Sequence, residues 1–473
     1  MDCRQRDLQM TRLKFWAMAV SGSVSLLAMG AVAQAQTFEE SLVLAYNSNP
    51  TLQAERARLR STDEGRVQAR SGYLPQVSAS ASVSSQHSES QSTFVIGGVP
   101  TSSGTNTSDS TPKNYSLTAS QSIYSGGRNG GALDQATALV YAGRESLRSV
   151  EQTVLIDAAT AFMDVRRDEE VVNIRRSNAD VLAQHLDAAR DRFEVGEITR
   201  TDVAQAEARL SGAQAELSAA QAQLATSRAA YQRVTGQPAA TLQDPPALPE
   251  LPGDLASAAE TAYQYSPQLL AAQYGEQAAH ESIRIARSSL RPQVSISASA
   301  TGSRDGSYAG DQRDSTAIVG QVSVPLFTGG MNRSRVRAAI AQEEQARHQV
   351  LEARRLVTEG VTNAWYAYVT SLAVIESSQQ AVRANEIALD GVEQEAYVGL
   401  RTTLDVLDAE QELLGSRLTL VTAERDSFVA GYRLLQAMGL LSAERMGLDV
   451  DVYEIASQSD GFDFPNFDLT PWN

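Results

Sequence analysis

Two stretches of the chain place apolar residues at alternating steps of three and four. Starting from Val203, nine of the ten positions reached by these steps are apolar. The same pattern returns 203 positions later, from Val406 to Ala437. A sustained period of ~3.5 residues predicts helices that wind around each other as left-handed coiled coils. The ten positions of the first stretch are Val203, Ala206, Leu210, Ala213, Leu217, Ala220, Leu224, Ser227, Tyr231 and Val234.

The helices that precede these stretches are expected to be very long. Residues 331–397 contain no proline, and residues 129–194 correspond to them at the same spacing. One continuous helix of this length would span about 100 Å at ~1.5 Å per residue. A second apolar stripe, formed by Leu356, Trp365 and Leu372, lies off the coiled-coil seam. Because such a helix needs two neighbours, the pattern predicts a wall of helices in a rod or tube.

Four shorter segments alternate apolar and polar residues as strands do, with a proline before or at the end of three of them. Their length of about 8–10 residues suits tilted strands that cross a membrane. Four strands cannot enclose a pore, whereas twelve strands from three chains can, and closure removes the unpaired edges. The predicted strands cover residues 76–84, 115–124, 293–300 and 317–326.

The chain is predicted to contain two copies of one helix–β-hairpin–helix unit. Residues 195–210 and 398–413 share 8 of 16 positions at an offset of 203. Upstream the offset becomes 217, because the first copy carries extra residues within 86–114. That segment is rich in Ser, Thr and Gly and is predicted to be an exposed loop facing the outside of the cell. The two repeats are expected to span residues 36–236 and 255–439.

Two segments outside the repeats differ from them in composition. Residues 237–254 hold five prolines, which predicts a stiff linker between the repeats. Residues 440–473 end in acidic and aromatic residues without periodicity, and we expect this C-terminal tail to be poorly ordered.

The first 35 residues have the pattern of a signal peptide. Arg12 and Lys14 precede a mostly apolar stretch, and Ala33-Gln34-Ala35 supplies small residues for cleavage after Ala35. A retained membrane anchor is the alternative interpretation, and translation could start at Met1 or at Met10. No later segment has the ~18 consecutive apolar residues that a membrane-spanning helix needs.

Composition excludes several classes of function. The net charge of −16 argues against nucleic acid as a partner, because a phosphate backbone attracts basic surfaces. The single cysteine, Cys3, rules out a disulfide framework, and the four histidines are far apart in sequence, so no metal site is expected. The sequence also lacks the glycine-rich and catalytic motifs of nucleotide-binding proteins and hydrolases. We therefore expect neither enzymatic activity nor a cofactor.

The chain resembles the TolC family of trimeric outer-membrane efflux channels. The resemblance rests on YLPQV and LRPQV before strands, YSGGRN and LFTGGMN after them, and most specifically on YVGLRTTLDVLDAEQELL at residues 397–414. It implies a mainly α-helical protein with a β-barrel in the outer membrane. In the homotrimer the 12-stranded barrel would continue as a coiled-coil tunnel through the periplasm, where coiled coils close the entrance.

The resemblance also implies a set of residues that close the periplasmic entrance. Asp405 and Asp408, three positions apart on one helical face, correspond to acidic rings at the entrance, where six carboxylates of a trimer would attract cations and raise each other's pKa. Arg401 corresponds to an arginine that ties one coil to its neighbours. Its expected partners in the first repeat are Thr201 and Asp202.

A second set corresponds to the helix–turn–helix tips that a periplasmic adaptor contacts. These tip residues are Val195 and Gly196 in the first repeat and Val398, Gly399 and Leu400 in the second.

Simpler interpretations of the gate residues remain open. Asp202 could cap the helix that follows it, which is a common role of aspartate, and Asp405 with Asp408 could form a solvated helix face. Tyr397 lies one position away from the tyrosine that contributes to the gate in this family. We therefore do not assign Tyr397 to the gate.

The function implied is a passive exit duct in the outer membrane. It would dock with an inner-membrane pump and a periplasmic adaptor to expel drugs or other small molecules. The alternative is the exit duct of a type I system, in which an ABC exporter secretes a protein. A periplasmic coiled-coil scaffold or adaptor without a pore is less favoured, because it would not need two matched β-hairpins.

Overall fold

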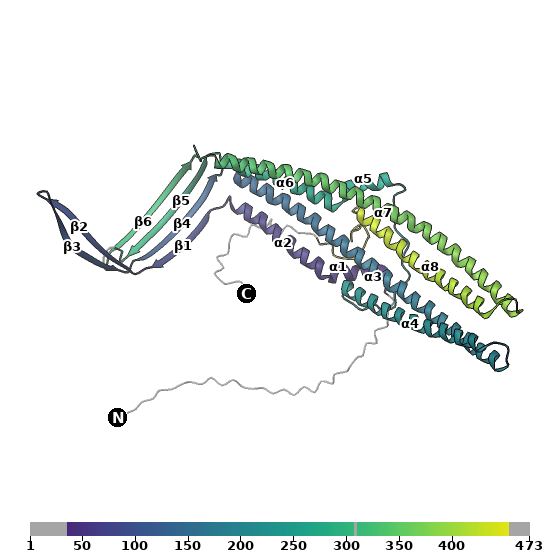
Figure 1. The fold of residues 1–473 in the computed structure, drawn as a ribbon. Coiled ribbons are helices and arrows are strands. Elements are labelled where there is room, and N and C mark those ends of the chain that lie inside the picture. The colour runs from purple at the N-terminus through teal and green to yellow at the C-terminus, as the bar shows by residue number, and fades with distance from the viewer. Residues whose placement is uncertain (1–35, 307–309, 454–473) are drawn as a thin grey trace, which may run out of the picture.

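The computed structural model describes residues 36–306 and 310–453. The predicted signal peptide and the last 20 residues of the predicted tail lie outside these ranges. The described chain is elongated, with strands at one end and long helices at the other (Figure 1). The eight helices of the described chain are α1 (Phe38–Ser48), α2 (Pro50–Ser71), α3 (Arg128–Glu194), α4 (Arg200–Thr235), α5 (Leu255–Tyr265), α6 (Pro267–Ser288), α7 (Met331–Tyr397) and α8 (Thr403–Ala437).

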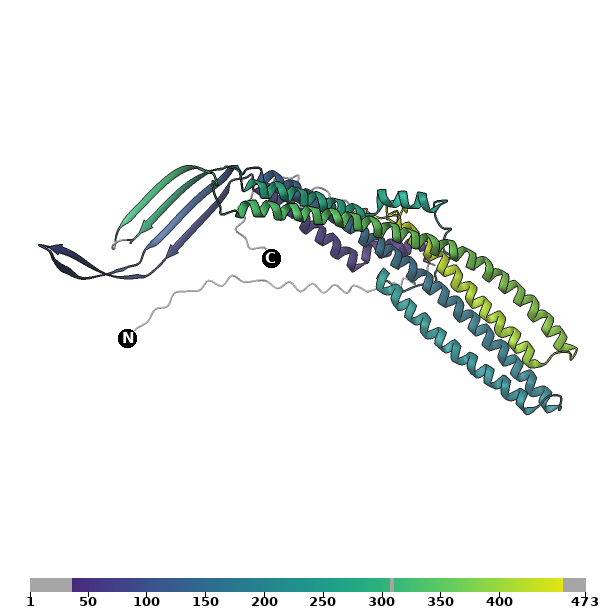
Figure 2. The ribbon, with the colours of Figure 1, turned by 45° about the horizontal axis from the view of Figure 1, so that its top comes forward.

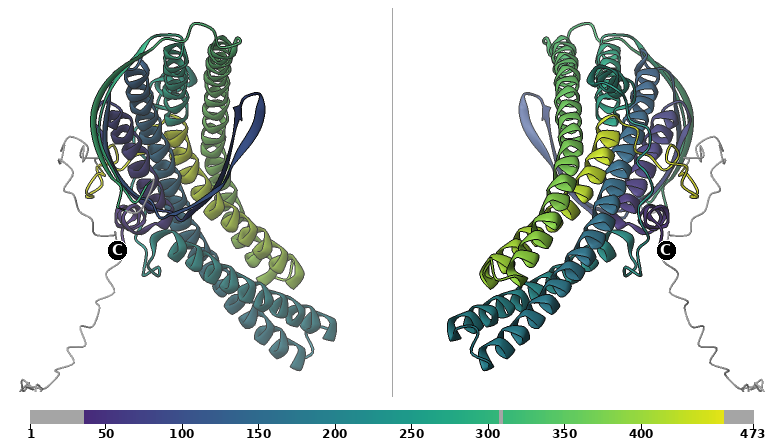
Figure 3. Two further views of the ribbon diagram at one scale, coloured as in Figure 1. Left: turned by 90° about the vertical axis from the view of Figure 1, so that its left-hand side faces the viewer. Right: turned by 90° about the vertical axis from the view of Figure 1, so that its right-hand side faces the viewer.

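The long helices form two antiparallel hairpins, α3 with α4 and α7 with α8. The shorter α2 and α6 extend along α3 beside the strands, and α5 packs against α7. The two hairpins approach each other through α3 and α8 and end as separate tips (Figures 2 and 3). None of the helices in the described ranges is long and apolar enough to cross a membrane.

A four-stranded antiparallel sheet joins the two halves of the chain in the order β1-β4-β5-β6. Strands β4 and β5 form the junction, with Ala119 opposite Ala298. The outer strands β1 and β6 each pair on one side only. These four strands are β1 (Gln76–Val83), β4 (Lys113–Tyr124), β5 (Gln293–Arg304) and β6 (Gln312–Ser323).

The bounds of the second hairpin of this sheet differ from the prediction, because β5 is longer than predicted and β6 ends earlier. β5 continues to Arg304 instead of ending at residue 300, because its polar residues pair with β6 up to Gln312. β6 stops at Ser323, whereas the prediction continued to residue 326. The segment 324–326 contains Pro325, which has no amide hydrogen to donate to a neighbouring strand.

The prediction of a loop at residues 86–114 is wrong. The segment forms a second antiparallel hairpin, β2 (Gln86–Ile96) with β3 (Val99–Ser110), which projects beyond the four-stranded sheet (Figure 1). Gly97 and Gly98 join the two strands with positive φ angles of 60° and 86°. Two glycines between strands are a strong hairpin signal, which the loop-like composition of the segment obscured.

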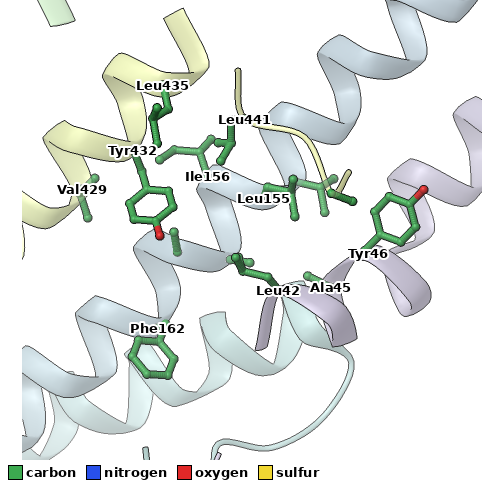
Figure 4. Close-up of a cluster of buried hydrophobic side chains, with 14 of the residues drawn as sticks. Leu42, Ala45, Tyr46, Leu155, Ile156, Phe162, Val429, Tyr432, Leu435 and Leu441 are labelled. Atoms are coloured by element: carbon green, nitrogen blue, oxygen red, sulfur yellow. The ribbon is translucent and has the colours of Figure 1, made fainter. Parts of the chain in front are cut away.

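An aromatic cluster fixes α1 against the two long hairpins. The ring of Phe38 packs edge-on against Phe162 of α3 and Phe428 of α8, with centroids 5.4 Å and 5.2 Å apart. Tyr432 completes the cluster at 5.2 Å from Phe38. Such pairs add to the stability that burial of the rings already provides. Figure 4 shows Phe162 and Tyr432 of this cluster among the buried side chains where α1, α3 and α8 meet.

The expectation of a poorly ordered tail is wrong for residues 440–453. After α8 the chain turns back onto the core, where Leu441 and Ala443 are buried. The amide of Ala443 donates a hydrogen bond of 2.7 Å to Glu151 on α3. This stretch lacks helical periodicity because it consists of turns, so its buried residues could not be identified from a repeating pattern.

Candidate periplasmic gate and docking tips

The tip of the first hairpin is a tight turn that requires glycine. Val195 is the C-cap residue of α3, and Gly196 follows with a φ angle of +81°. The amide of Glu197 donates to the carbonyl of Arg192 at 2.9 Å, which completes the terminal bonds of the helix. A side chain at Gly196 would be strained in this left-handed conformation.

The tip of the second hairpin has the same geometry 203 positions later. Val398 is the C-cap residue of α7, Gly399 has a φ angle of +78°, and the amide of Leu400 donates to the carbonyl of Glu395 at 2.8 Å. The side chains of Val195, Val398 and Leu400 are exposed. Each tip therefore presents apolar surface to solvent.

Asp202 and Asp405 occupy equivalent positions in the first turns of α4 and α8. The Asp202 carboxylate accepts hydrogen bonds of 2.8 Å from both the amide and the hydroxyl of Thr199. Asp405 accepts in the same way from Thr402, at 2.9 Å and 2.8 Å. These capping interactions stabilise the helix starts. Asp202 therefore takes part in capping α4, although the N-cap residue itself is Thr199, three residues before it.

The capping bonds also change the acidity of both groups. Hydrogen bonds from the hydroxyl and the amide of Thr199 lower the pKa of Asp202. Those from the amide and the hydroxyl of Thr402 lower the pKa of Asp405. Both shifts favour the charged carboxylate, in the opposite direction to the mutual repulsion expected in an acidic ring.

The remaining gate candidates have charged partners that sequence reasoning did not identify. The guanidinium of Arg401 donates to Glu395 at 2.8 Å within its own tip, and this contact raises the pKa of Arg401. Asp408 accepts from Arg209 of α4 at 2.9 Å, so this carboxylate links the two hairpins. Arg209 lies next to Leu210 of the coiled-coil seam, but no sequence pattern indicates which helix its side chain faces.

Within one chain, Arg401 forms no contact with either of its expected partners. The carboxylate of Asp202 bonds to Thr199, and the hydroxyl of Thr201 makes no hydrogen bond to any described residue. Asp405 and Asp408 lie three positions apart within the first two turns of α8. An Arg401 contact with the first repeat would therefore have to form with another chain.

A second polar link between the hairpins lies further from the tips. The imidazole Nε2 of His185 on α3 is 2.7 Å from Oε1 of Glu410 on α8, and Glu410 is only 9% exposed. The other carboxylate oxygen of Glu410 is buried without a hydrogen bond to any described atom. The bond with Glu410 raises the pKa of His185, although partial burial acts against it.

We expect this link to make stability depend on pH. Because the folded-state pKa of His185 is raised, its stabilisation is complete below the ordinary value of ~6.5 and is lost as pH rises through the folded pKa. The melting temperature should therefore decrease as the pH rises from about 6 to about 8. His185→Gln should flatten this dependence, whereas the matched change His348→Gln, at an exposed histidine of α7, should leave it intact. Equal pH dependence in all three proteins would contradict the assignment.

The described residues offer no metal site. Within 36–306 and 310–453, no three His, Cys, Asp or Glu side chains are arranged to hold an ion. The carboxylates at the tips bond to threonine or arginine partners instead.

The profile of the outer membrane efflux protein family matches residues 42–237 and 258–440. The chain belongs to this family. Members are outer-membrane channel proteins and not enzymes, and the location of the chain is accordingly the outer membrane.

Curated relatives of this outer membrane efflux protein cover most of its length. It is 34% identical over 440 residues to outer membrane efflux protein BepC of Brucella suis biovar 1 (strain 1330). The matched region covers 93% of this chain and 92% of BepC. It is 26% identical over 439 residues to outer membrane protein TolC of Escherichia coli (strain K12), across 89% and 86% of the two chains. It is 24% identical over 305 residues to the alkaline protease secretion protein AprF of Pseudomonas aeruginosa, and the matched region covers 63% of each chain.

The fold is also found among solved structures. The outer membrane protein VceC of Vibrio cholerae superposes with a TM-score of 0.70 at 22% identity, over 85% of this chain and 96% of VceC. This structural similarity agrees with the predicted architecture, in which long helices form a tunnel.

Proposed function

We propose that three copies of this outer membrane efflux protein form a passive exit duct. The observation that carries the proposal is the four-stranded sheet with unpaired edges at β1 and β6. Backbone groups at such edges cannot remain unbonded in lipid, so β6 of one chain would pair with β1 of the next. Three sheets would close a barrel of twelve strands, continued by the long helices as a tunnel through the periplasm.

The duct would depend on partners for energy and for delivery of its substrate. An inner-membrane pump would supply the energy, and a periplasmic adaptor would bind the exposed apolar tips at Val195, Val398 and Leu400. Apolar surface rimmed by polar residues is typical of such interaction sites. In a periplasmic scaffold without a pore, a sheet with unpaired edges at β1 and β6 would have no function.

The substrates favoured are drugs or other small molecules. The relative with 34% identity is named an efflux protein, which supports this class. The relative AprF is named a protease secretion protein, which supports the exit duct of a type I secretion system as the second candidate. Deletion strains should separate them: increased drug sensitivity with unchanged secreted proteins would favour efflux, and the reverse would favour secretion.

Native mass and conductance together test the duct. The purified mature protein should have the mass of three chains starting at Gln36 and should form ion-conducting channels in a planar lipid bilayer. Proline has no amide hydrogen and disrupts an edge that must pair, so Val319→Pro in β6 should reduce trimer assembly. The matched change Thr107→Pro in β3, outside the four-stranded sheet, should not. A monomer that conducts nothing would refute the proposal.

A further inference from the structure

A hollow of about 650 Å³ lies beside the aromatic core, where α1, α2 and α3 meet the residues that follow α8. Its volume is within the range of ~300–1,000 Å³ that is usual for ligand sites. Apolar side chains form part of its wall, including Leu52, Leu59 and Leu147. Four arginines and two glutamates provide the charges: Arg56, Arg144, Arg148, Arg445, Glu151 and Glu444.

Three of these arginines are held by tyrosine rings instead of carboxylates. The guanidinium carbon of Arg56 lies 4.5 Å from the ring of Tyr46, and that of Arg445 lies 4.3 Å from the ring of Tyr265. Arg144 is placed similarly at 5.4 Å from a tyrosine ring. In the described ranges none of the three forms an ion pair, and Nε of Arg56 is buried without a hydrogen bond.

The two glutamates offset only part of the charge of the four arginines. Glu151 accepts the amide of Ala443, and burial raises its pKa, which disfavours its charged form. Glu444 is exposed and forms no ion pair within the described ranges. Arg148 bonds to Glu145 on its own helix. The hollow therefore keeps a positive balance of charge, with guanidinium donors available for an anionic group.

The described chain ends in this hollow. Val452 and Tyr453 are part of its lining, the amide of Tyr453 donates to the hydroxyl of Tyr46 at 3.1 Å, and Arg56 lies 5.3 Å from the ring of Tyr453. The next 20 residues, 454–473, contain no Lys or Arg. Their acidic and aromatic members are Glu454, Asp460, Phe462, Asp463, Phe464, Phe467, Asp468 and Trp472.

We propose that residues 454–473 bind in this hollow of their own chain through their aspartates and aromatic rings. Carboxylates would accept paired hydrogen bonds from Arg144 and Arg445, and aromatic rings would stack on guanidinium faces or contact the apolar wall. About seven residues separate Tyr453 from Asp460, an extended reach of about 25 Å, so the segment can fold back over the hollow. Bound in this way, it ties α2 and α3 to the stretch after α8.

Trp472 provides a direct readout in the full-length protein. Trp365 and Trp472 are the only tryptophans after the predicted cleavage site, so Trp365→Phe leaves Trp472 as the single fluorophore. In the purified mature protein, Trp472 should be shielded from acrylamide, a neutral quencher. Added salt should reduce the shielding, because it screens the ion pairs.

Substitutions on both sides of the contact test its specificity. Arg144→Gln/Arg445→Gln should shift the ratio of bound to free segment at least tenfold towards free, because charge-assisted hydrogen bonds are lost. Asp460→Asn/Asp463→Asn/Asp468→Asn should do the same, and combining both sets should add little. The matched control Arg60→Gln/Arg433→Gln removes two exposed arginines that do not line the hollow and should change nothing.

Two results would overturn the proposal. Equal quenching of Trp472 in the reference protein and in the arginine variant would mean that the segment does not occupy the hollow. Shielding that disappears on dilution of the protein would mean that the segment binds another molecule instead of its own chain.

Discussion

Block of the channel by a trivalent cation added from the periplasmic side should weaken tenfold or more in Asp405→Asn/Asp408→Asn. In the proposed trimer six carboxylates would converge on one axis at the first turns of α8. A trivalent ion near them feels their summed field, which water and salt screen only in part. Asparagine retains an oxygen that can accept the Thr402 hydrogen bonds, so the start of α8 should remain intact. The measurement is the blocking concentration in a planar bilayer, with the cation on one side at a time.

A matched control removes the same number of charges elsewhere on the long helices. Glu344 and Glu359 are exposed on α7, more than 30 residues from its tip. Glu344→Gln/Glu359→Gln should leave the block unchanged. If both double variants are blocked as well as the reference protein, the acidic ring does not lie at Asp405 and Asp408.

The structure changes the expected pH dependence of this block. Mutual repulsion alone would raise the pKa values and relieve the block in mild acid. However, the hydrogen bonds from Thr402 lower the pKa of Asp405 and so oppose the effect of repulsion between neighbouring carboxylates. Block through Asp405 should therefore persist at about pH 5. Arg209 bonds to Asp408 and offsets part of its charge, so Asp405→Asn alone should remove more of the block than Asp408→Asn alone.

Arg401→Ser should raise the conductance of the resting channel severalfold and make cells sensitive to large antibiotics. We expect this because a guanidinium at one tip can hold a neighbouring chain through Thr201 and Asp202, and threefold symmetry repeats the contact. Thr201 is available for such a contact, since its hydroxyl has no partner among the described residues of its own chain. Thr201→Val should therefore produce the same change in conductance.

The contact between Arg401 and Glu395 supplies the control. Glu395→Gln removes the charge that holds Arg401 within its own tip at 2.8 Å, without touching Thr201 or Asp202. If the lock acts between chains, Glu395→Gln should leave the channel as closed as before or more closed. An increase in conductance for Glu395→Gln equal to that for Arg401→Ser would assign the effect to the shape of the tip and refute the lock.

The long helices were the most predictable part of the fold. The proline-free stretch 331–397 coincides with α7, because helix length follows from the absence of breaking residues and from a sustained apolar period. The glycines of the tips were also identifiable, since Gly196 and Gly399 recur at the repeat offset and both adopt positive φ. Local sequence signals determine features of this kind.

Contacts between distant segments were not predictable in the same way. The hydrogen bonds of His185 with Glu410 and of Arg209 with Asp408 join residues about 200 or more positions apart, and no local pattern indicates which helix faces which. The β2–β3 hairpin was missed for a different reason. Its serines and threonines suit strands as well as loops, and only Gly97-Gly98 marked the turn.

The aromatic cluster of Phe38, Phe162 and Phe428 has a mechanical consequence. It fixes α1, α3 and α8 at one level, and α3 continues from Phe162 to Glu194 beyond it. At ~1.5 Å per residue, this part of α3, together with the α4 helix packed along it, is a lever about 48 Å long. A rotation of about 10° at the level of the cluster would therefore move the tip by about 8 Å. A small movement in the middle of the protein is thus amplified into a displacement at the tips comparable to the width of a helix.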